Sequence, residues 1–148
     1  MHFEIIPGAT GYIDTNYEAK AAATIKMFDK YDFVLTHINA TDEAAHMHDI
    51  AQKIAAIENV DRYILEPVFC HLKKYFRNNF AVIVCGDHKT RCCDGKHIGD
   101  PVPFLFYLDN KALKQVRKLF KENPVPCRSV LSLQFIKEAI DGYSQDER

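Results

Sequence analysis

Two series of apolar residues predict helices in the first half of the chain. The first series recurs every three or four positions, at Tyr17, Ala21, Ile25 and Phe28. It predicts a helix over residues 16–30, in which Thr15 and Glu18 have the spacing of a capping box. The second series starts near residue 44 and continues through Met47, Ile50, Ile54, Ile57 and Ile64. Pro67 either kinks or ends this helix, and apolar residues beyond it indicate a continuation to about residue 77.

Short apolar runs predict strands. Residues 33–38 are rich in β-branched side chains, and residues 104–108 form a second run of this kind. Residues 80–85 are apolar without interruption, a pattern typical of a strand covered on both faces, as in a parallel sheet. Residues 3–7 fit a further short strand, followed by a turn at residues 8–11.

Helices and strands alternate along the chain. Two more helices are predicted over residues 111–121 and 133–140, and Gly142 ends the second of them. This alternation indicates one α/β domain over residues 1–148, with a sheet between layers of helices. In such sheets, ligands bind at the carboxyl ends of the strands.

The composition fits an intracellular globular domain. The chain has 148 residues, of which 47% are apolar, and its formal net charge of -1 argues against a nucleic-acid partner. No apolar run reaches the roughly 18 residues of a membrane span, and the N-terminus lacks the pattern of a signal peptide. We therefore expect no membrane partner and a cytoplasmic location. The cysteines are odd in number, lack CxxC spacing and are expected to be free thiols: Cys70, Cys85, Cys92, Cys93 and Cys127.

Candidate metal ligands follow two of the predicted strands or lie in the long loop over residues 86–102. They are Asp42, His46, Asp87, His88 and His97. The first two are four residues apart, which places both on one face at a helix start. The next two are adjacent at a strand end, where both side chains can face one crevice. Carboxylate oxygen and imidazole nitrogen suit Zn²⁺ or Mn²⁺, but spacing alone does not separate such a site from ordinary surface or capping residues.

Four strings of residues resemble one known family in order and spacing. They are PGATGYIDTNYEAK at residues 7–20, DEAAH at 42–46, GDH at 86–88 and HIGDPVP at 97–103. The strings resemble the archaeal-type phosphoglycerate mutases that are independent of 2,3-bisphosphoglycerate and belong to the alkaline phosphatase superfamily. The similarity runs from Pro7 to about Gly142, but it corresponds only to the C-terminal part of a family member. Residue 45 is Ala, where the family usually has Gly.

The resemblance implies an alkaline-phosphatase-like sheet, two divalent metal ions and a phosphorylated Ser intermediate, without 2,3-bisphosphoglycerate as a cofactor. Asp42, His46 and His97 correspond to the ligands of one ion. Asp87 and His88 correspond to two ligands of the other. The ions would be Mn²⁺ or Zn²⁺, with Mg²⁺ left open by the ligand set. The complete enzyme would bind phosphoglycerate and move its phosphoryl group between the 2- and 3-hydroxyls.

Part of that machinery has no counterpart in this sequence. In the family, the Ser nucleophile and a further Asp ligand belong to motifs near the start of a longer chain, and neither motif is visible here. We therefore expect no mutase turnover from this polypeptide alone, and turnover measured on it would refute the expectation. A sheet divided in this way leaves an edge or an apolar face bare, so we expect a homo-oligomer, a partner chain or poor solubility.

Several alternatives stand beside the mutase. The first is another enzyme of the superfamily, such as a phosphatase, phosphopentomutase or phosphonate hydrolase. The second is a non-catalytic metal-binding or regulatory module, and the third is a fragment without a separate function. Cys92 and Cys93 could form a redox or zinc element with His88 and His97, but adjacent cysteines rarely form an unstrained disulfide. His37 fits either a residue behind the metal ligands or a satisfied core histidine.

Overall fold

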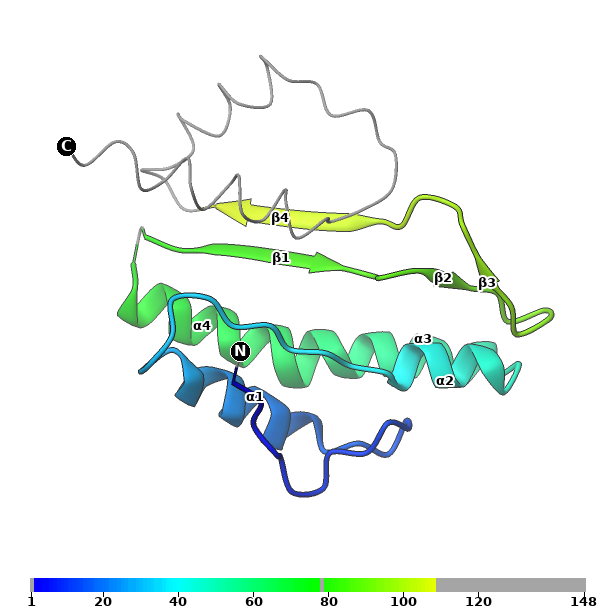
Figure 1. The fold of residues 1–148 in the computed structure, drawn as a ribbon, viewed down its shortest axis with the longest axis horizontal. Coiled ribbons are helices and arrows are strands. Elements are labelled where there is room, and N and C mark those ends of the chain that lie inside the picture. Colours follow the sequence, from blue (N-terminus) through cyan, green and yellow to red (C-terminus); the bar gives the residue numbers. More distant parts are fainter. Residues whose placement is uncertain (1, 78, 109–148) are drawn as a thin grey trace, which may run out of the picture.

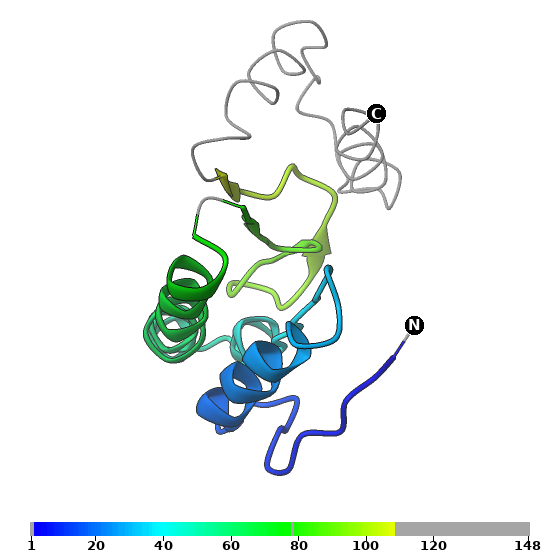
Figure 2. The ribbon, with the colours of Figure 1, turned by 90° about the vertical axis from the view of Figure 1, so that its left-hand side faces the viewer.

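The structure is a computed structural model that describes residues 2–77 and 79–108. The predicted helices over 111–121 and 133–140 lie outside the described residues, as does Cys127. Helices and strands separate into two layers in the described part (Figures 1 and 2). The α/β class expected from the sequence is confirmed. Within the described residues the helices lie on one side of the strands only, so the expected helices on both faces of a sheet are not seen there.

Helix α1 spans Tyr17–Met27, and its N-cap is Asn16. The Oδ1 atom of Asn16 accepts a hydrogen bond from the backbone N–H of Ala19 at 2.8 Å. Thr15, the predicted cap, is buried, and its hydroxyl has no hydrogen-bond partner among the described residues. The predicted capping box was therefore wrong by one residue, and a better capping side chain takes its place.

Residues 33–38 form no strand, so that prediction was wrong. The backbone between α1 and the next helix runs as an extended segment (Figure 1). It pairs with no strand of the described part, and side chains of α1 contact it instead. Lys20 Nζ donates to the backbone oxygen of His37 at 3.4 Å, and the hydroxyls of Thr24 and Thr36 are 2.6 Å apart. Lys20 is buried against this segment, and that burial lowers the pKa of its ammonium group. Residues 3–7 likewise form no strand.

The predicted long helix is divided near its start. Helix α2 spans Ala40–His46 and α3 spans Ile50–Val60. Between them His48 has φ +58°, a left-handed conformation that ends α2, and Asp49 then caps α3 by accepting from the N–H of Gln52 at 2.9 Å.

Downstream, the helical path continues through Pro67. A π-helical turn, η1 (Asp61–Leu65), connects α3 to α4 (Glu66–Tyr75). A proline ring clashes with the carbonyl four residues before it, which here is Tyr63 within the wider π turn. The helix therefore accommodates Pro67 by widening one turn before it, and the predicted continuation to about residue 77 is confirmed to Tyr75.

Two of the predicted strands are confirmed, but they do not pair as expected. Strands β1 (Ala81–Cys85) and β4 (Phe104–Leu108) are antiparallel, with Ala81 opposite Leu108 and Cys85 opposite Phe104. The predicted loop between them contains a small antiparallel pair, β2 (Lys89–Thr90) and β3 (His97–Ile98). No parallel pair occurs in the described part of the chain, and Ala81 and Cys85 of β1 are exposed there, so the expected parallel strand covered on both faces is not found.

The described core is small and is made of side chains from the helices α1 to α4 and from η1. It consists of Tyr17, Ala21, Ala40, Ala56, Ile64, Val68 and Leu72, with Phe80 and Val82 of the strand region packed against it. Phe69 of α4 also contacts the rings of Phe80 and Tyr107, with centroids 5.9 and 4.8 Å apart, which attaches the helix layer to the strands. Within these ranges, no helix is long and apolar enough to cross a membrane.

Large apolar side chains lie uncovered on both layers of the described part. The helix side includes Met47, Ile50, Ile54 and Ile57, and the strand side includes Phe104 and Leu105. Ile50 is 63% exposed, although the spacing of this series is that of a buried helix face. The periodicity therefore identified a helix, but not a face that the described residues bury.

The cap of α1 gives a direct test of this local structure. Asn16→Ala removes the acceptor for the Ala19 N–H, and we expect a loss of about 1 kcal/mol in the free energy of unfolding. Thr15→Val replaces a buried hydroxyl without a partner, so it should be neutral or stabilising. Urea unfolding of both variants measures this difference. If Thr15→Val lowered the free energy of unfolding more than Asn16→Ala, Thr15 and not Asn16 would be the cap of α1.

Candidate metal centre

Helix α2 presents two of the predicted ligands. Its three buried residues, Ala40, Ala44 and Ala45, have no exposed surface and pack one side of the short helix into the protein. Asp42 and His46 lie one turn apart, with Asp42 Oδ2 3.3 Å from His46 Nε2. The close packing of the alanines fixes where α2 lies, and the two polar side chains are thereby held side by side.

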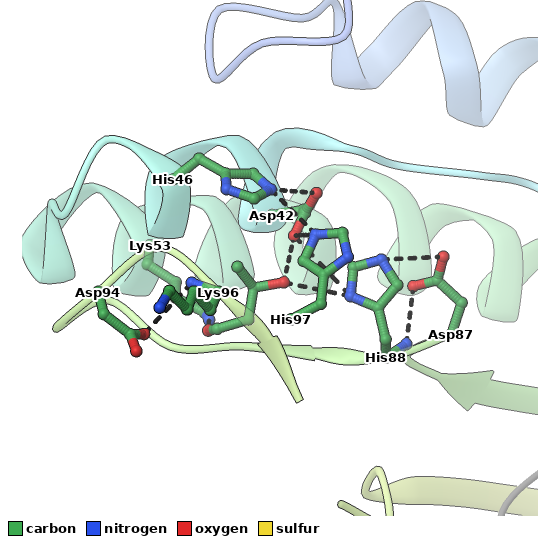
Figure 3. Close-up of polar contacts among 9 residues, drawn as sticks. Asp42, His46, Lys53, Asp87, His88, Asp94, Lys96 and His97 are labelled. Atoms are coloured by element: carbon green, nitrogen blue, oxygen red, sulfur yellow. Dashed lines mark hydrogen bonds and ion pairs between the residues drawn. The ribbon is translucent and has the colours of Figure 1, made fainter. Parts of the chain in front are cut away.

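His97 reaches the same place from β3. Its Nε2 atom is 3.0 Å from His46 Nε2 and 3.6 Å from Asp42 Oδ1. The ligand atoms of these three residues all lie within 4.8 Å of one another (Figure 3). The structure therefore brings together, from positions 42, 46 and 97, the three residues that the resemblance assigned to one ion.

These distances suit a divalent cation. Donor atoms bonded at about 2.0–2.1 Å to one tetrahedral ion lie roughly 3.3 Å apart. Nε2 of His46 is 3.0 Å from Nε2 of His97 and 3.3 Å from Asp42 Oδ2, while Nε2 of His97 is 3.6 Å from the other carboxylate oxygen, Oδ1. The set combines one carboxylate with two imidazoles, which suits zinc and manganese. His97 is 51% exposed at its side chain, so one side of the site remains open to a further ligand. The residues present thus fit a divalent metal ion.

His88 lies at the border of this cluster, whereas Asp87 points away from it. The His88 ring stacks on His97 with centroids 3.8 Å apart, and its Nδ1 atom is 4.0 Å from Asp42 Oδ1. Asp87 Oδ2 is 3.5 Å from His88 Nε2, on the other side of that ring (Figure 3), and the Asp87 side chain is 72% exposed. The predicted second pair therefore adjoins the three-residue cluster without joining it.

Thr90 was missed by the sequence analysis. It is 7% exposed, and its hydroxyl donates a short hydrogen bond to Asp42 Oδ1. The hydroxyl oxygen of Thr90 is also 3.1 Å from His88 Nδ1, and Lys53 of α3 donates to the Thr90 backbone oxygen at 2.7 Å. A threonine two residues after a histidine has no distinctive spacing, so only the three-dimensional structure reveals this contact.

The environment of Asp42 favours its anionic form. Burial raises the pKa of this carboxyl, but the hydrogen bond from Thr90 and the three nearby imidazoles of His46, His88 and His97 together lower it below the ordinary value. Asp42 is therefore ionised at neutral pH and needs to lose no proton before it binds a cation.

Contacts of the turn between β2 and β3 bring His97 to α2. His48, in the break between α2 and α3, has its Nδ1 atom 2.8 Å from the backbone oxygen of Cys92. Arg91 forms a close ion pair with Asp94, and Asp94 also accepts from the N–H of Lys96 at 3.2 Å. The Asp42–His46–His97 group contains no cysteine, and the cysteines within the described ranges are free thiols.

Comparison with known proteins gives concordant matches. The profile of the metalloenzyme superfamily matches residues 1–124. The 2,3-bisphosphoglycerate-independent phosphoglycerate mutase of Methanosarcina acetivorans is 38% identical over 120 residues, which cover 81% of this chain and 30% of that protein. The mutase of the same name from Saccharolobus islandicus is 42% identical over 115 residues, covering 78% of this chain and 27% of that protein.

A solved structure is similar in fold as well. The PH0037 protein of Pyrococcus horikoshii superposes with a TM-score of 0.64 at 35% sequence identity. The match covers 72% of this chain and 31% of the archaeal protein. This chain thus spans about 30% of the length of the curated relatives named above, in line with a partial domain.

Metal titration tests the three-residue cluster. We expect the wild-type chain to bind Mn²⁺ or Zn²⁺ tightly in isothermal titration calorimetry. His97→Ala should weaken binding by about 100-fold or more, since loss of a ligand costs more than the 10–100-fold of an outer contact. His71→Ala is the matched control, because His71 packs on Tyr75 of α4, with ring centroids 4.4 Å apart, and is not in the cluster. Equal affinity for the wild type and His97→Ala would rule out this site.

Proposed function

This chain belongs to the metalloenzyme superfamily, and on that basis we propose that it forms the metal-binding part of a phosphoglycerate mutase independent of 2,3-bisphosphoglycerate. The observation that carries the proposal is the convergence of Asp42, His46 and His97 on one point. The archaeal relatives that bear the name of this mutase support the choice of substrate. We propose that the complete enzyme interconverts 2- and 3-phosphoglycerate, a step of glycolysis, in the cytoplasm.

The described residues have separate tasks in this proposal. Asp42, His46 and His97 would hold one ion, and His88 with Asp87 would contribute to a second. A bound divalent ion supplies positive charge that neutralises a transferring phosphoryl group. Asp42 supplies the fixed negative charge, and the imidazoles supply neutral donors, so the site retains net positive charge toward an anionic substrate when it is loaded. The donor set favours Mn²⁺ or Zn²⁺ and leaves Mg²⁺ open.

Turnover needs groups beyond those described. The resemblance assigns the phosphoryl-accepting Ser and a further Asp ligand to motifs that these 148 residues do not contain. We propose that both come from outside the printed sequence, either from a longer protein or from a partner chain. The uncovered side chains of Ile50, Ile54 and Ile57 on α3, and of Phe104 and Leu105 on β4, support contact with such a partner or with a second copy of the chain.

A second candidate is a non-catalytic metal-binding module. The observation in its favour is the Asp42–His46–His97 cluster itself, because binding an ion needs no phosphoryl-accepting Ser. Another enzyme of the superfamily, such as a phosphatase, would use the same ligands. These candidates differ from the mutase in what happens to phosphoglycerate, and that difference can be measured.

A segment exchange tests the proposed activity. The matching segment of the Methanosarcina acetivorans mutase is replaced by the 120 residues of this chain that align with it. We expect the chimera to interconvert 3- and 2-phosphoglycerate in a metal-dependent way, because it supplies equivalent ligands. ³¹P NMR follows both isomers and inorganic phosphate together.

The controls separate the candidates. His97→Ala in the same chimera should abolish interconversion, and circular dichroism identifies any chimera that fails to fold. Release of inorganic phosphate without interconversion would favour a phosphatase. A folded, metal-loaded chimera that leaves phosphoglycerate unchanged would contradict the mutase and favour the non-catalytic module.

A further inference from the structure

Thr90 is a buried residue that contacts both predicted groups of ligands. Its hydroxyl donates to Asp42 of the three-residue cluster, and the same oxygen lies 3.1 Å from Nδ1 of His88 in the adjoining pair. Without Thr90 these two residues would not be hydrogen-bonded, because His88 Nδ1 is 4.0 Å from Asp42 Oδ1. Thr90 is thus the link between them.

Proton counting sets the direction of both bonds. A threonine hydroxyl has one proton, and here that proton is donated to Asp42 Oδ1. The oxygen can then only accept from His88, so His88 must carry its proton on Nδ1. In the neutral ring the lone pair is then on Nε2, the nitrogen that lies 3.5 Å from Asp87 Oδ2. Nε2 of His88 is therefore left as the atom that can bind a metal.

The hydrogen bond to Thr90 also orients Asp42. It occupies Oδ1 of the carboxylate, while Oδ2 lies 3.3 Å from Nε2 of His46. Oδ1 also lies 3.6 Å from Nε2 of His97, so each oxygen faces one imidazole of the three-residue cluster, and the hydrogen bond from Thr90 holds the carboxylate in that orientation. Outer hydrogen bonds of this kind fix the orientation and basicity of metal ligands.

Thr90 is itself held by a neighbouring helix. Lys53 of α3 donates from Nζ to the Thr90 backbone oxygen at 2.7 Å. The threonine is 7% exposed and sits in the two-residue strand β2, so its side chain has little freedom to turn away. The backbone at Thr90 is therefore held by α3 and β2, and burial restricts the side chain that carries the hydroxyl.

We propose that Thr90 is a positioning residue that orients Asp42 and fixes His88 in the Nδ1–H tautomer, so that Nε2 of His88 is the metal-binding atom. This inference rests on the proposed metal-binding function. A single hydroxyl would thus position one ligand from each group: Asp42, which lies 48 residues away in the sequence, and His88, which lies 2 residues away.

Two matched variants of the full chain test this role. Thr90→Val keeps the shape of the side chain but removes the hydroxyl, whereas Thr90→Ser keeps the hydroxyl and removes a methyl group. With Mn²⁺ alone as the probe in calorimetry, we expect Thr90→Val to weaken binding about 10–100-fold. Thr90→Ser should stay within about 3-fold of the wild type, because both hydrogen bonds persist. A merely structural role would predict comparable losses from both variants.

A spectroscopic measurement reads the tautomer without metal. Long-range ¹H–¹⁵N correlation of the histidine rings in the metal-free wild type should show His88 protonated at Nδ1. In Thr90→Val that preference should be lost, and in Thr90→Ser it should be retained. If Thr90→Val does not fold, the wild-type spectrum and Thr90→Ser still decide the question.

The outcomes distinguish this inference from the function on which it rests. Wild-type chain that binds no Mn²⁺ would refute the metal site, while the spectra would still test the contact of Thr90 with His88. Tight wild-type binding with equal affinity in Thr90→Val would overturn the role of Thr90 and leave the metal site standing. A neutral wild-type His88 that carries its proton on Nε2 and not on Nδ1 would also overturn it.

Discussion

The Asp42 carboxylate is the group on which the rest of the site depends. It accepts from Thr90, and it lies within 4.0 Å of ring nitrogens from His46, His88 and His97. Four polar side chains from two distant parts of the sequence are thus gathered around one charge. Without an anion at this position, the three imidazoles and the buried hydroxyl of Thr90 would have no common acceptor, and the hydroxyl would lose the group to which it donates.

The fold contributes by fixing where that charge lies. Three fully buried alanines leave α2 little room to shift, and the left-handed residue His48 ends the helix directly after its last ligand. The side chain of His48 then contacts the backbone of Cys92 in the turn between β2 and β3. His48 therefore ends the helix that carries Asp42 and His46, and it also contacts the turn that precedes His97. The two ligand segments are thereby positioned relative to each other.

The sequence predicted the parts of this arrangement that depend on local pattern. Apolar runs located β1 and β4, and the resemblance identified Asp42, His46 and His97, which the structure brings together. The run at residues 33–38 was misread because an extended segment held by Lys20 and Thr24 of α1 has the same composition as a strand. The apolar series between residues 47 and 64 continues across the break at His48 and so concealed it.

Longer-range features left no such pattern. Antiparallel pairing of β1 with β4 depends on the path of the residues between them, which the apolar runs do not encode. The contact of Thr90 with Asp42 spans 48 positions, and a single hydroxyl has no spacing by which it could be recognised. The exposed isoleucines of α3 show the same limit, because their period indicates an apolar face but not what covers it.

X-ray absorption spectroscopy of the zinc-loaded chain tests the central claim most directly, because it reads the atoms bonded to the ion. A site formed by Asp42, His46 and His97 predicts only nitrogen and oxygen neighbours at about 2.0–2.1 Å, with the outer scattering of two imidazole rings. Sulfur at about 2.3 Å would show that cysteines such as Cys92 or Cys93 bind the ion, and it would contradict the site described here.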